Sequence, residues 1–327
     1  MKPEPILRSF KLVLPLALLA YFLWRYVDVD TFIFLAGSVG LAPVAAYVAS
    51  LLAARWLQAI QARIALRESG VSIDPVDIFR VQLVSTFYTM FVPGDLVGGG
   101  VTWYMLKRIG GKGAAIATTL IYLRLVFLAS AIPFVIFGML MESRLHSASV
   151  LGALAIASTM TVILTAPLVF RSASRHADGL LLAIAHRLGG RMAGTRRALT
   201  VVRESITTCA AASPRSTAIV FGLAVALHLL GAVGLALASE AANANVPAHA
   251  FFWIWPLMIV VHMLPISIGG LGVREITLIY LLGKLYSTPA ENALLLSMIA
   301  LAATVVFSLA GGAWNSLRAG LPDNRPG

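Results

Sequence analysis

The sequence predicts an all-α protein that crosses a membrane several times. Of its 327 residues, 59% are hydrophobic and only 12% are charged. A soluble domain has roughly 25% charged residues, so this chain has too few polar groups to cover a surface that faces water everywhere. Its apolar runs reach the roughly 20 residues that a helix needs to cross a bilayer. No polar stretch is long enough for a second folded domain, so a single integral membrane domain is expected over residues 1–327.

The uninterrupted apolar runs predict about six full membrane spans. In chain order they cover residues 10–25, 31–54, 113–141, 149–170, 216–239 and 290–317. The first run ends in bulky Phe22, Leu23 and Trp24, which favours an uncleaved helix over a cleaved signal peptide. Residues 55–77 are amphipathic and charged, which predicts a surface helix followed by a loop.

Two further apolar stretches, 78–106 and 250–286, are interrupted by proline and glycine. The interruptions read FVPGDLVGGGV over residues 91–101 and MLPISIGGLGV over residues 263–273. Aligning Pro93 with Pro265, 172 residues apart, also aligns Gly98 with Gly270, Gly100 with Gly272 and Val101 with Val273. Each valine is expected to open a new helix. The match predicts an internal repeat, with one copy at about 31–141 and the other at about 216–317.

The basic residues predict how the chain is oriented. If both interrupted stretches are re-entrant hairpins, 20 of the 25 lysines and arginines fall on one side of the membrane. They lie in the two termini and in the loops 55–80, 107–112 and 171–215. Because positively charged loops stay in the cytoplasm, both termini are expected there, in a bacterial inner (plasma) membrane. The two hairpins then enter from opposite sides, which is the inverted repeat found in many transporters.

Interrupted helices predict an internal polar site. Proline removes a backbone donor, and an unpaired backbone group in hydrocarbon costs several kcal/mol. Irregular backbone at membrane depth is therefore expected to be buried in protein or to line a wet cavity. Half-helices starting near Val101 or Val273 would point N–H groups that favour anions into this cavity. The alternative is that the glycines only allow close helix packing.

Four charged residues in apolar sequence are candidates for this site. Arg124 lies near the middle of the 113–141 run, where an arginine costs about 2.5–3.5 kcal/mol, although it could also snorkel to the interface. Arg274 and Glu275 directly follow the second interruption, and neighbouring positions on a helix need not pair. Arg274 could bind a phosphate or carboxylate, and Glu275 could hold either arginine or accept protons. Asp95, in the first interruption, favours a helix cap over catalysis, and a structural ion pair remains the alternative for Arg274 and Glu275.

Several classes of function lack their sequence signals. The single cysteine, Cys209, allows neither an internal disulfide nor a multi-thiolate metal site. No nucleotide-binding loop, HExxH motif or dinucleotide fingerprint is present, so no catalytic residue, metal or cofactor is expected. The histidines His228 and His262 are expected to be core residues. The net charge of +11 fits cytoplasmic loops near anionic headgroups better than it fits nucleic acid.

The segment MLPISIGGLGVRE, Met263–Glu275, resembles the signature of the flippase-like transmembrane region of lysylphosphatidylglycerol synthases. VPGDLVGGG, followed by LKRIG and TTLIYLR, resembles the other marked region of that family. The resemblance covers about residues 10–318 and implies the translocating half of these proteins without the synthase half. The positions that carry over by this similarity are Pro265, Gly269, Gly270, Gly272, Arg274 and Glu275, with Arg124 as the membrane arginine. In the first interruption, the added candidates for lipid binding are Pro93, Asp95, Gly98, Gly99 and Gly100.

These observations lead to one main expectation and three alternatives. The main expectation is a lipid translocase, in which an anionic or polyprenyl-phosphate-type headgroup enters the cavity between the hairpins. The first alternative is a non-transporting membrane partner of an envelope lipid or glycan synthesis enzyme. The second is a membrane-embedded transferase, which would need a carboxylate such as Asp95 or Glu275. The third is a small-solute transporter.

Overall fold

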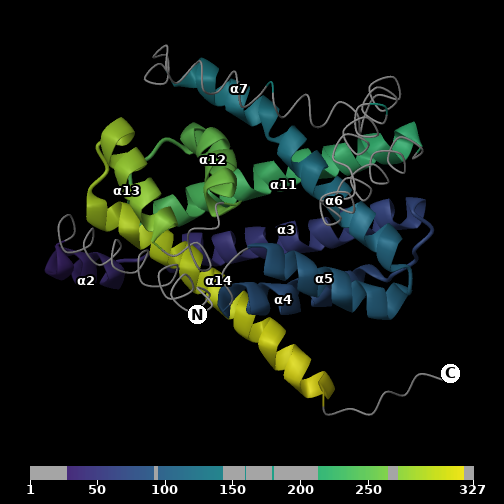
Figure 1. Cartoon of the computed structure of the whole chain (residues 1–327). Coiled ribbons are helices and arrows are strands. Elements are labelled where there is room, and N and C mark those ends of the chain that lie inside the picture. Colours follow the sequence, from purple (N-terminus) through teal and green to yellow (C-terminus); the bar gives the residue numbers. More distant parts are fainter. Residues whose placement is uncertain are drawn as a thin grey trace, which may run out of the picture. The chain divides into compact units, whose positions relative to one another are not determined.

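The computed structural model describes residues 28–91, 95–142, 213–263 and 272–319, together with Thr159 and Gly179. Every regular element in this part of the chain is a helix, as the sequence predicted (Figure 1). The helices are α2 (Val29–Gly37), α3 (Leu41–Glu68), α4 (Pro75–Phe91), α5 (Asp95–Gly110), α6 (Gly113–Ser130), α7 (Ile132–Met141), α11 (Pro214–Ala241), the 3-10 helix η3 (Ala248–Ala250), α12 (Phe251–Met263), α13 (Val273–Tyr286) and α14 (Ala290–Ala319).

Four stretches of helix in the described residues are long and apolar enough to cross a membrane. They are Leu41–Glu68, Gly113–Gly138, Pro214–Ala241 and Ala290–Ser316. Each overlaps one of the six predicted spans, which confirms a multi-pass membrane protein. The predicted spans 10–25 and 149–170 lie outside the described residues, so the total of six stays a prediction, as does the inverted repeat.

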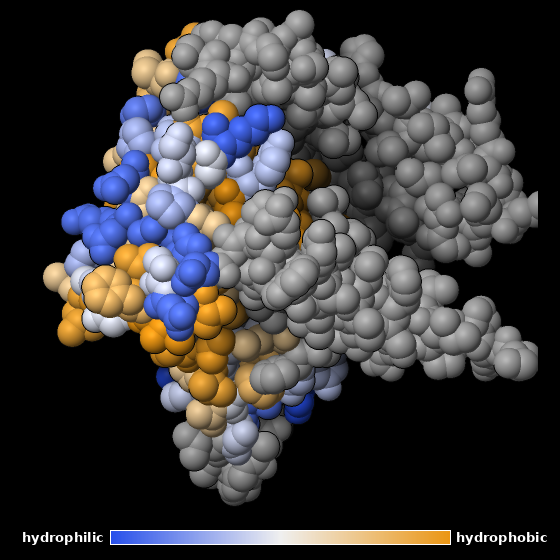
Figure 2. All heavy atoms as spheres, turned by 90° about the vertical axis from the view of Figure 1, so that its left-hand side faces the viewer, coloured by the Kyte–Doolittle hydropathy of each residue, from blue (hydrophilic) through white to orange (hydrophobic). Residues whose placement is uncertain are grey.

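Large apolar side chains remain exposed on these helices, as expected where lipid is the solvent. Examples are Leu52 on α3, Val233 on α11 and Val306 on α14. Figure 2 shows one face of the molecule, on which apolar side chains (orange) stay uncovered beside hydrophilic ones (blue). An uncovered apolar surface of this kind is stable in a bilayer but not in water.

The prediction of a separate surface helix at 55–77 is wrong, because α3 continues to Glu68. No proline or glycine interrupts the chain between Ala54 and Glu68, so nothing stops the helix. It ends where Gly70 adopts a left-handed conformation (φ 72°). There the N–H of Val71 bonds to Leu66 O and that of Gly70 to Arg67 O, which is the Schellman pattern of a helix C-terminus.

The chain forms two compact units, each made of segments that are distant in sequence. The first unit contains residues 1–54, 80–102 and 230–327, and the second contains 55–79 and 103–229. Both interrupted stretches fall in the first unit. The core of the second unit joins α3, α6 and α11 through a cluster of buried side chains, namely Ala65, Tyr122, Val126, Val220 and Ala224.

Within the first unit, α14 packs against α2, α13 and α4. Its contact with α4 depends on small residues. Ser308 Oγ donates to Thr86 O at 3.1 Å. A side chain at Gly311 would collide with the backbone of Leu83, and one at Gly312 would collide with the Phe87 ring. The two glycines therefore allow the helix axes to approach closely, as small residues do in membrane proteins.

This contact predicts that Gly311→Ala destabilises the protein by about 1–3 kcal/mol, because the added methyl group meets backbone that cannot turn aside. Gly222→Ala on α11 is the matched control, since no atom lies within 4 Å of its added methyl group. The control is expected to leave stability unchanged or to raise it by up to about 1 kcal/mol. Unfolding in detergent micelles measures both variants, and equal stability of the two would contradict the packing.

Candidate functional site

The second interruption ends at the start of α13, where Val273 opens the helix as predicted. Gly272 is the N-cap residue and has φ 86°, a conformation that favours glycine. Its N–H donates to Glu275 Oε2 at 2.6 Å. Glu275 is the third residue of the helix, so this bond is the reciprocal half of a capping box. Gly272 therefore sets the backbone, and Glu275 satisfies one of the free donors at the helix start.

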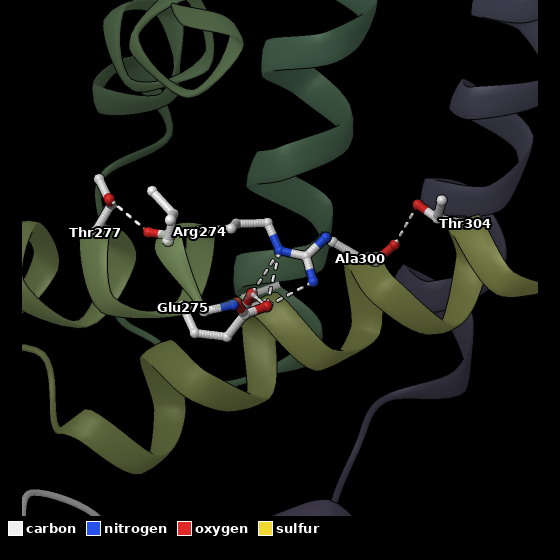
Figure 3. A network of polar contacts seen from close by, with 8 residues as sticks. Arg274, Glu275, Thr277, Ala300 and Thr304 are labelled. Carbon is white, nitrogen blue, oxygen red and sulfur yellow. Dashed lines mark hydrogen bonds and ion pairs between the residues drawn. The ribbon is translucent and has the colours of Figure 1, made fainter. Parts of the chain in front are cut away.

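Arg274 and Glu275 form a buried ion pair beside this cap (Figure 3). Arg274 Nη2 donates to Glu275 Oε1 at 2.7 Å, and Arg274 Nε donates to the same oxygen at 3.1 Å. Only 8% of the arginine side chain and none of the glutamate side chain is exposed. The two side chains thus form one charge-compensated group inside the protein.

Ser297, on α14, completes the network. Its hydroxyl accepts a hydrogen bond from Arg274 Nε at 2.8 Å and donates one to Glu275 Oε1 at 2.9 Å. In Figure 3 the guanidinium of Arg274 lies against α14 next to Ala300. The ion pair is thereby tied to a helix that qualifies as a membrane span.

Sequence reasoning did not identify Ser297, and it underestimated the contact between the two charged residues. Adjacent helix positions point about 100 degrees apart, yet the long arginine side chain folds back onto the carboxylate. A cation in the first turn of a helix is opposed by the helix dipole, and Glu275 offsets that cost. The available signal was Ser297 itself, a polar residue in the otherwise apolar sequence ALLLSMIALAA.

The donors around the pair are unequally used. Both oxygens of Glu275 are occupied, by Gly272, Arg274 and Ser297. Arg274 bonds through Nε and Nη2, so within the described residues Nη1 is not part of this network. Within the described residues, Nη1 is thus the guanidinium nitrogen to which no hydrogen bond is assigned.

Comparison with known proteins identifies the family of the chain. The model of the lysylphosphatidylglycerol synthase TM region matches residues 9–312. The chain belongs to this family. No curated protein and no solved structure matches the chain. The match covers the Arg274–Glu275 network and both interruptions, and it confirms the predicted resemblance.

In this family member, the first interruption differs from the second. Helix α5 begins at Asp95, so the prediction that Val101 opens a helix is wrong. An acidic residue in the first turn stabilises a helix through the helix dipole. Close packing offsets the poor helix propensity of the three glycines. A side chain at Gly98 would collide with Thr89. Gly98 O also accepts hydrogen bonds from Thr102 Oγ1 (2.9 Å) and Ser85 Oγ (3.2 Å).

The structure describes only some of the remaining candidate residues. Gly98 has a packing role, whereas Gly99 and Gly100 are exposed with no atom close to where a side chain would be. Pro93, Pro265, Gly269 and Gly270 lie outside the described residues, as do the side chains of Asp95 and His262. Their assignment to a lipid site stays a prediction.

Arg124 and Arg274 belong to different compact units. Arg124 lies in the middle of α6 and is exposed, in contrast to the buried Arg274. A shared site for the two arginines stays a prediction. No cluster of three or more potential metal ligands occurs in the described residues.

His228, which was expected in the core, is fully buried on α11. Its Nε2 contacts Phe127 O at 2.8 Å, and its ring stacks on that of Phe127 at 4.3 Å. Near this point α6 gives way to α7, and the N–H of Ala131 bonds to Leu128 O rather than to Phe127 O. Ser130 Oγ donates to this carbonyl at 2.9 Å, so the serine and His228 together replace the backbone donor that the helix break has removed.

The ion pair predicts an unequal response to removing one charge or both. Glu275→Gln leaves a buried arginine without a counter-charge and is expected to lower the free energy of unfolding by about 3–5 kcal/mol. The double variant R274Q/E275Q removes both charges and is expected to lose much less than the sum of the single variants. Unfolding of all four proteins in the same detergent measures the coupling. Additive losses would contradict a tightly coupled pair.

Proposed function

We propose that this protein binds a phosphate-bearing membrane lipid beside the second interrupted stretch and moves the lipid headgroup across the bilayer. The family supports a membrane lipid-related function. The observation that carries the proposal is the buried Arg274–Glu275–Ser297 network, which directly follows the interruption and contacts a membrane span. Buried charges in membrane proteins are costly, and they mark substrate pathways more often than they mark simple packing.

The chemistry of the site favours a phosphate. A planar guanidinium offers several donors in a fixed arrangement that suits phosphate oxygens. Glu275 cancels the charge of Arg274, so an anion would be attracted by the N–H groups of Nη1, which bonds to no other described residue, and by the positive end of the α13 dipole. In this scheme Glu275 is a positioning residue, because its two contacts with Arg274 fix the orientation of the guanidinium.

The interrupted helices support the proposed movement of the headgroup. Both interruptions belong to one compact unit, which supports the idea that they line a common path. Helix α14 contacts α4, which precedes the first interruption, and α13, which follows the second. The acyl or prenyl tails would stay in the bilayer while the headgroup moves. Since the sequence has no nucleotide-binding loop, the drive would be an ion gradient or the concentration difference of the lipid itself.

Mass spectrometry of the lipids that co-purify with the protein tests this proposal. The wild type is expected to enrich one phosphate-bearing lipid relative to the bulk membrane. Arg274→Lys keeps a charge beside Glu275 but loses the guanidinium fork, so it is expected to retain about ten-fold less of that lipid. Arg274→Ala is less suitable, because it leaves Glu275 buried without a counter-charge.

Ser297→Ala is the matched control, because it removes two hydrogen bonds from the same network and leaves both charges and their direct contact in place. This variant is expected to keep the enriched lipid. Equal lipid retention by wild type and folded Arg274→Lys would refute the role of Arg274. The absence of any enriched lipid in the wild type would favour a small-solute transporter or a partner of an envelope-synthesis enzyme.

A further inference from the structure

Three membrane spans end together at one end of the second unit. Glu68, at the end of α3, accepts hydrogen bonds from Ser216 Oγ (2.5 Å) and Ser213 N (3.3 Å) at the start of α11. Lys112, just before α6, donates from Nζ to Gly70 O at 2.9 Å. These contacts join the C-terminus of one candidate span to the N-termini of two others.

The length and the charge of α3 favour a position of this end at the boundary between membrane and water. Helix α3 has 28 residues and is about 42 Å long, whereas the hydrocarbon core of a bilayer is about 30 Å thick. At least one end of α3 therefore has to leave the hydrocarbon core, and the end that carries Arg67 and Glu68 suits the headgroup region better than the uncharged start at residues 41–54. The loops that the sequence assigned to one side of the membrane, 55–80, 107–112 and 171–215, each contribute residues here.

The surface at this boundary is strongly basic. Five of the described residues here are exposed and cationic, namely Arg67, Lys107, Arg108, Lys112 and Arg215. None of them forms an ion pair with another described residue. The nearby acids are already engaged: Glu68 binds the start of α11, and Asp74 Oδ1 accepts the N–H of Val76 at 2.8 Å at the start of α4. Within the described residues, no acid offsets the cationic charge of this end, which makes it available to an anionic ligand.

A tryptophan positions one of these cations. Trp103 Nε1 donates to Gly113 O at 2.8 Å, which ties α5 to the start of α6. Lys107 Nζ lies 5.1 Å from the centre of the Trp103 ring, and its aliphatic part packs against Gly113. Tryptophan prefers the headgroup level of a membrane, with its polar edge toward water. Lys107 is thus held where lipid phosphates are found.

We propose that this basic end, formed by Arg67, Lys107, Arg108, Lys112 and Arg215, binds the headgroups of anionic phospholipids in the adjacent leaflet. The position and the charge of this surface favour such a ligand, since phospholipid headgroups are the anions found at the end of a membrane span. The basic end shares no residue with the Arg274–Glu275 network, so it would hold bound lipid independently of transport. Each basic residue near an anionic surface contributes about five-fold in affinity.

Lipid titrations of the full-length, delipidated protein in detergent test this proposal, with native mass spectrometry as the readout. The probes are phosphatidylglycerol and the zwitterionic phosphatidylcholine. The wild type is expected to prefer phosphatidylglycerol, and K107Q/R108Q to bind it about 25-fold more weakly. High salt is expected to reduce the preference, because these charges are exposed. Both replaced residues are exposed, so the variant should melt like the wild type.

Lys284→Gln is the matched control. Lys284 is also exposed and lies 5.5 Å from the centre of an aromatic ring, that of Tyr280, but it belongs to the first unit. This variant is expected to bind phosphatidylglycerol like the wild type. An equal loss in both variants, or no loss in K107Q/R108Q, would overturn the proposal. Displacement of the lipid by inorganic phosphate at the same concentration would also overturn it, because the site would then recognise phosphate alone.

The two lipid sites can be told apart. Arg274→Lys is expected to keep the phosphatidylglycerol preference of the basic end while it loses the lipid of the proposed transport site. K107Q/R108Q is expected to do the reverse. Loss of both lipids in K107Q/R108Q would overturn the independence of the basic end, whatever the fate of the transport proposal.

Discussion

Glu275 is fully buried, and a buried carboxylate has to be met by donors within the protein. Arg274, Ser297 and the N–H of Gly272 supply these donors, and each comes from a different structural requirement. The bond from the Gly272 N–H requires the left-handed turn at the start of α13. The bond from Ser297 requires that α14 lie against α13. One buried charge therefore fixes three features together: the orientation of the α13 start, the rotamer of Arg274 and the packing of α14.

Helix α14 extends this constraint through the first unit. Ser297 contacts the ion pair on α13, and Ser308, three turns further on, contacts Thr86 on α4. Eleven residues correspond to slightly more than three turns, so both serines lie on the same side of α14, about 16 Å apart along its axis. Gly311 continues this side and allows α4 to approach closely. A single face of one span thus connects the segments that flank the two interruptions.

The sequence predicted those parts of the site that depend on neighbouring residues. Val273 opens α13, and the adjacent Arg274 and Glu275 are the charged centre, because helix start and charges lie within one short motif. Ser297 was not predictable, since nothing local specifies which side of α14 meets α13. The start of α5 at Asp95 was also missed, because the packing of Gly98 against Thr89 outweighs the poor helix propensity of successive glycines. Tertiary contacts decided both of these features.

We propose above that Arg274 offers a guanidinium nitrogen to a lipid phosphate. A high-resolution cryo-EM structure of the protein in nanodiscs made from bacterial lipid extract tests it most directly. The account predicts headgroup density within hydrogen-bond distance of Arg274, about 2.7–2.9 Å, with the contacts between Arg274 and Glu275 intact. A well-resolved ion pair surrounded only by protein would contradict it and would leave the network a purely structural element of the fold.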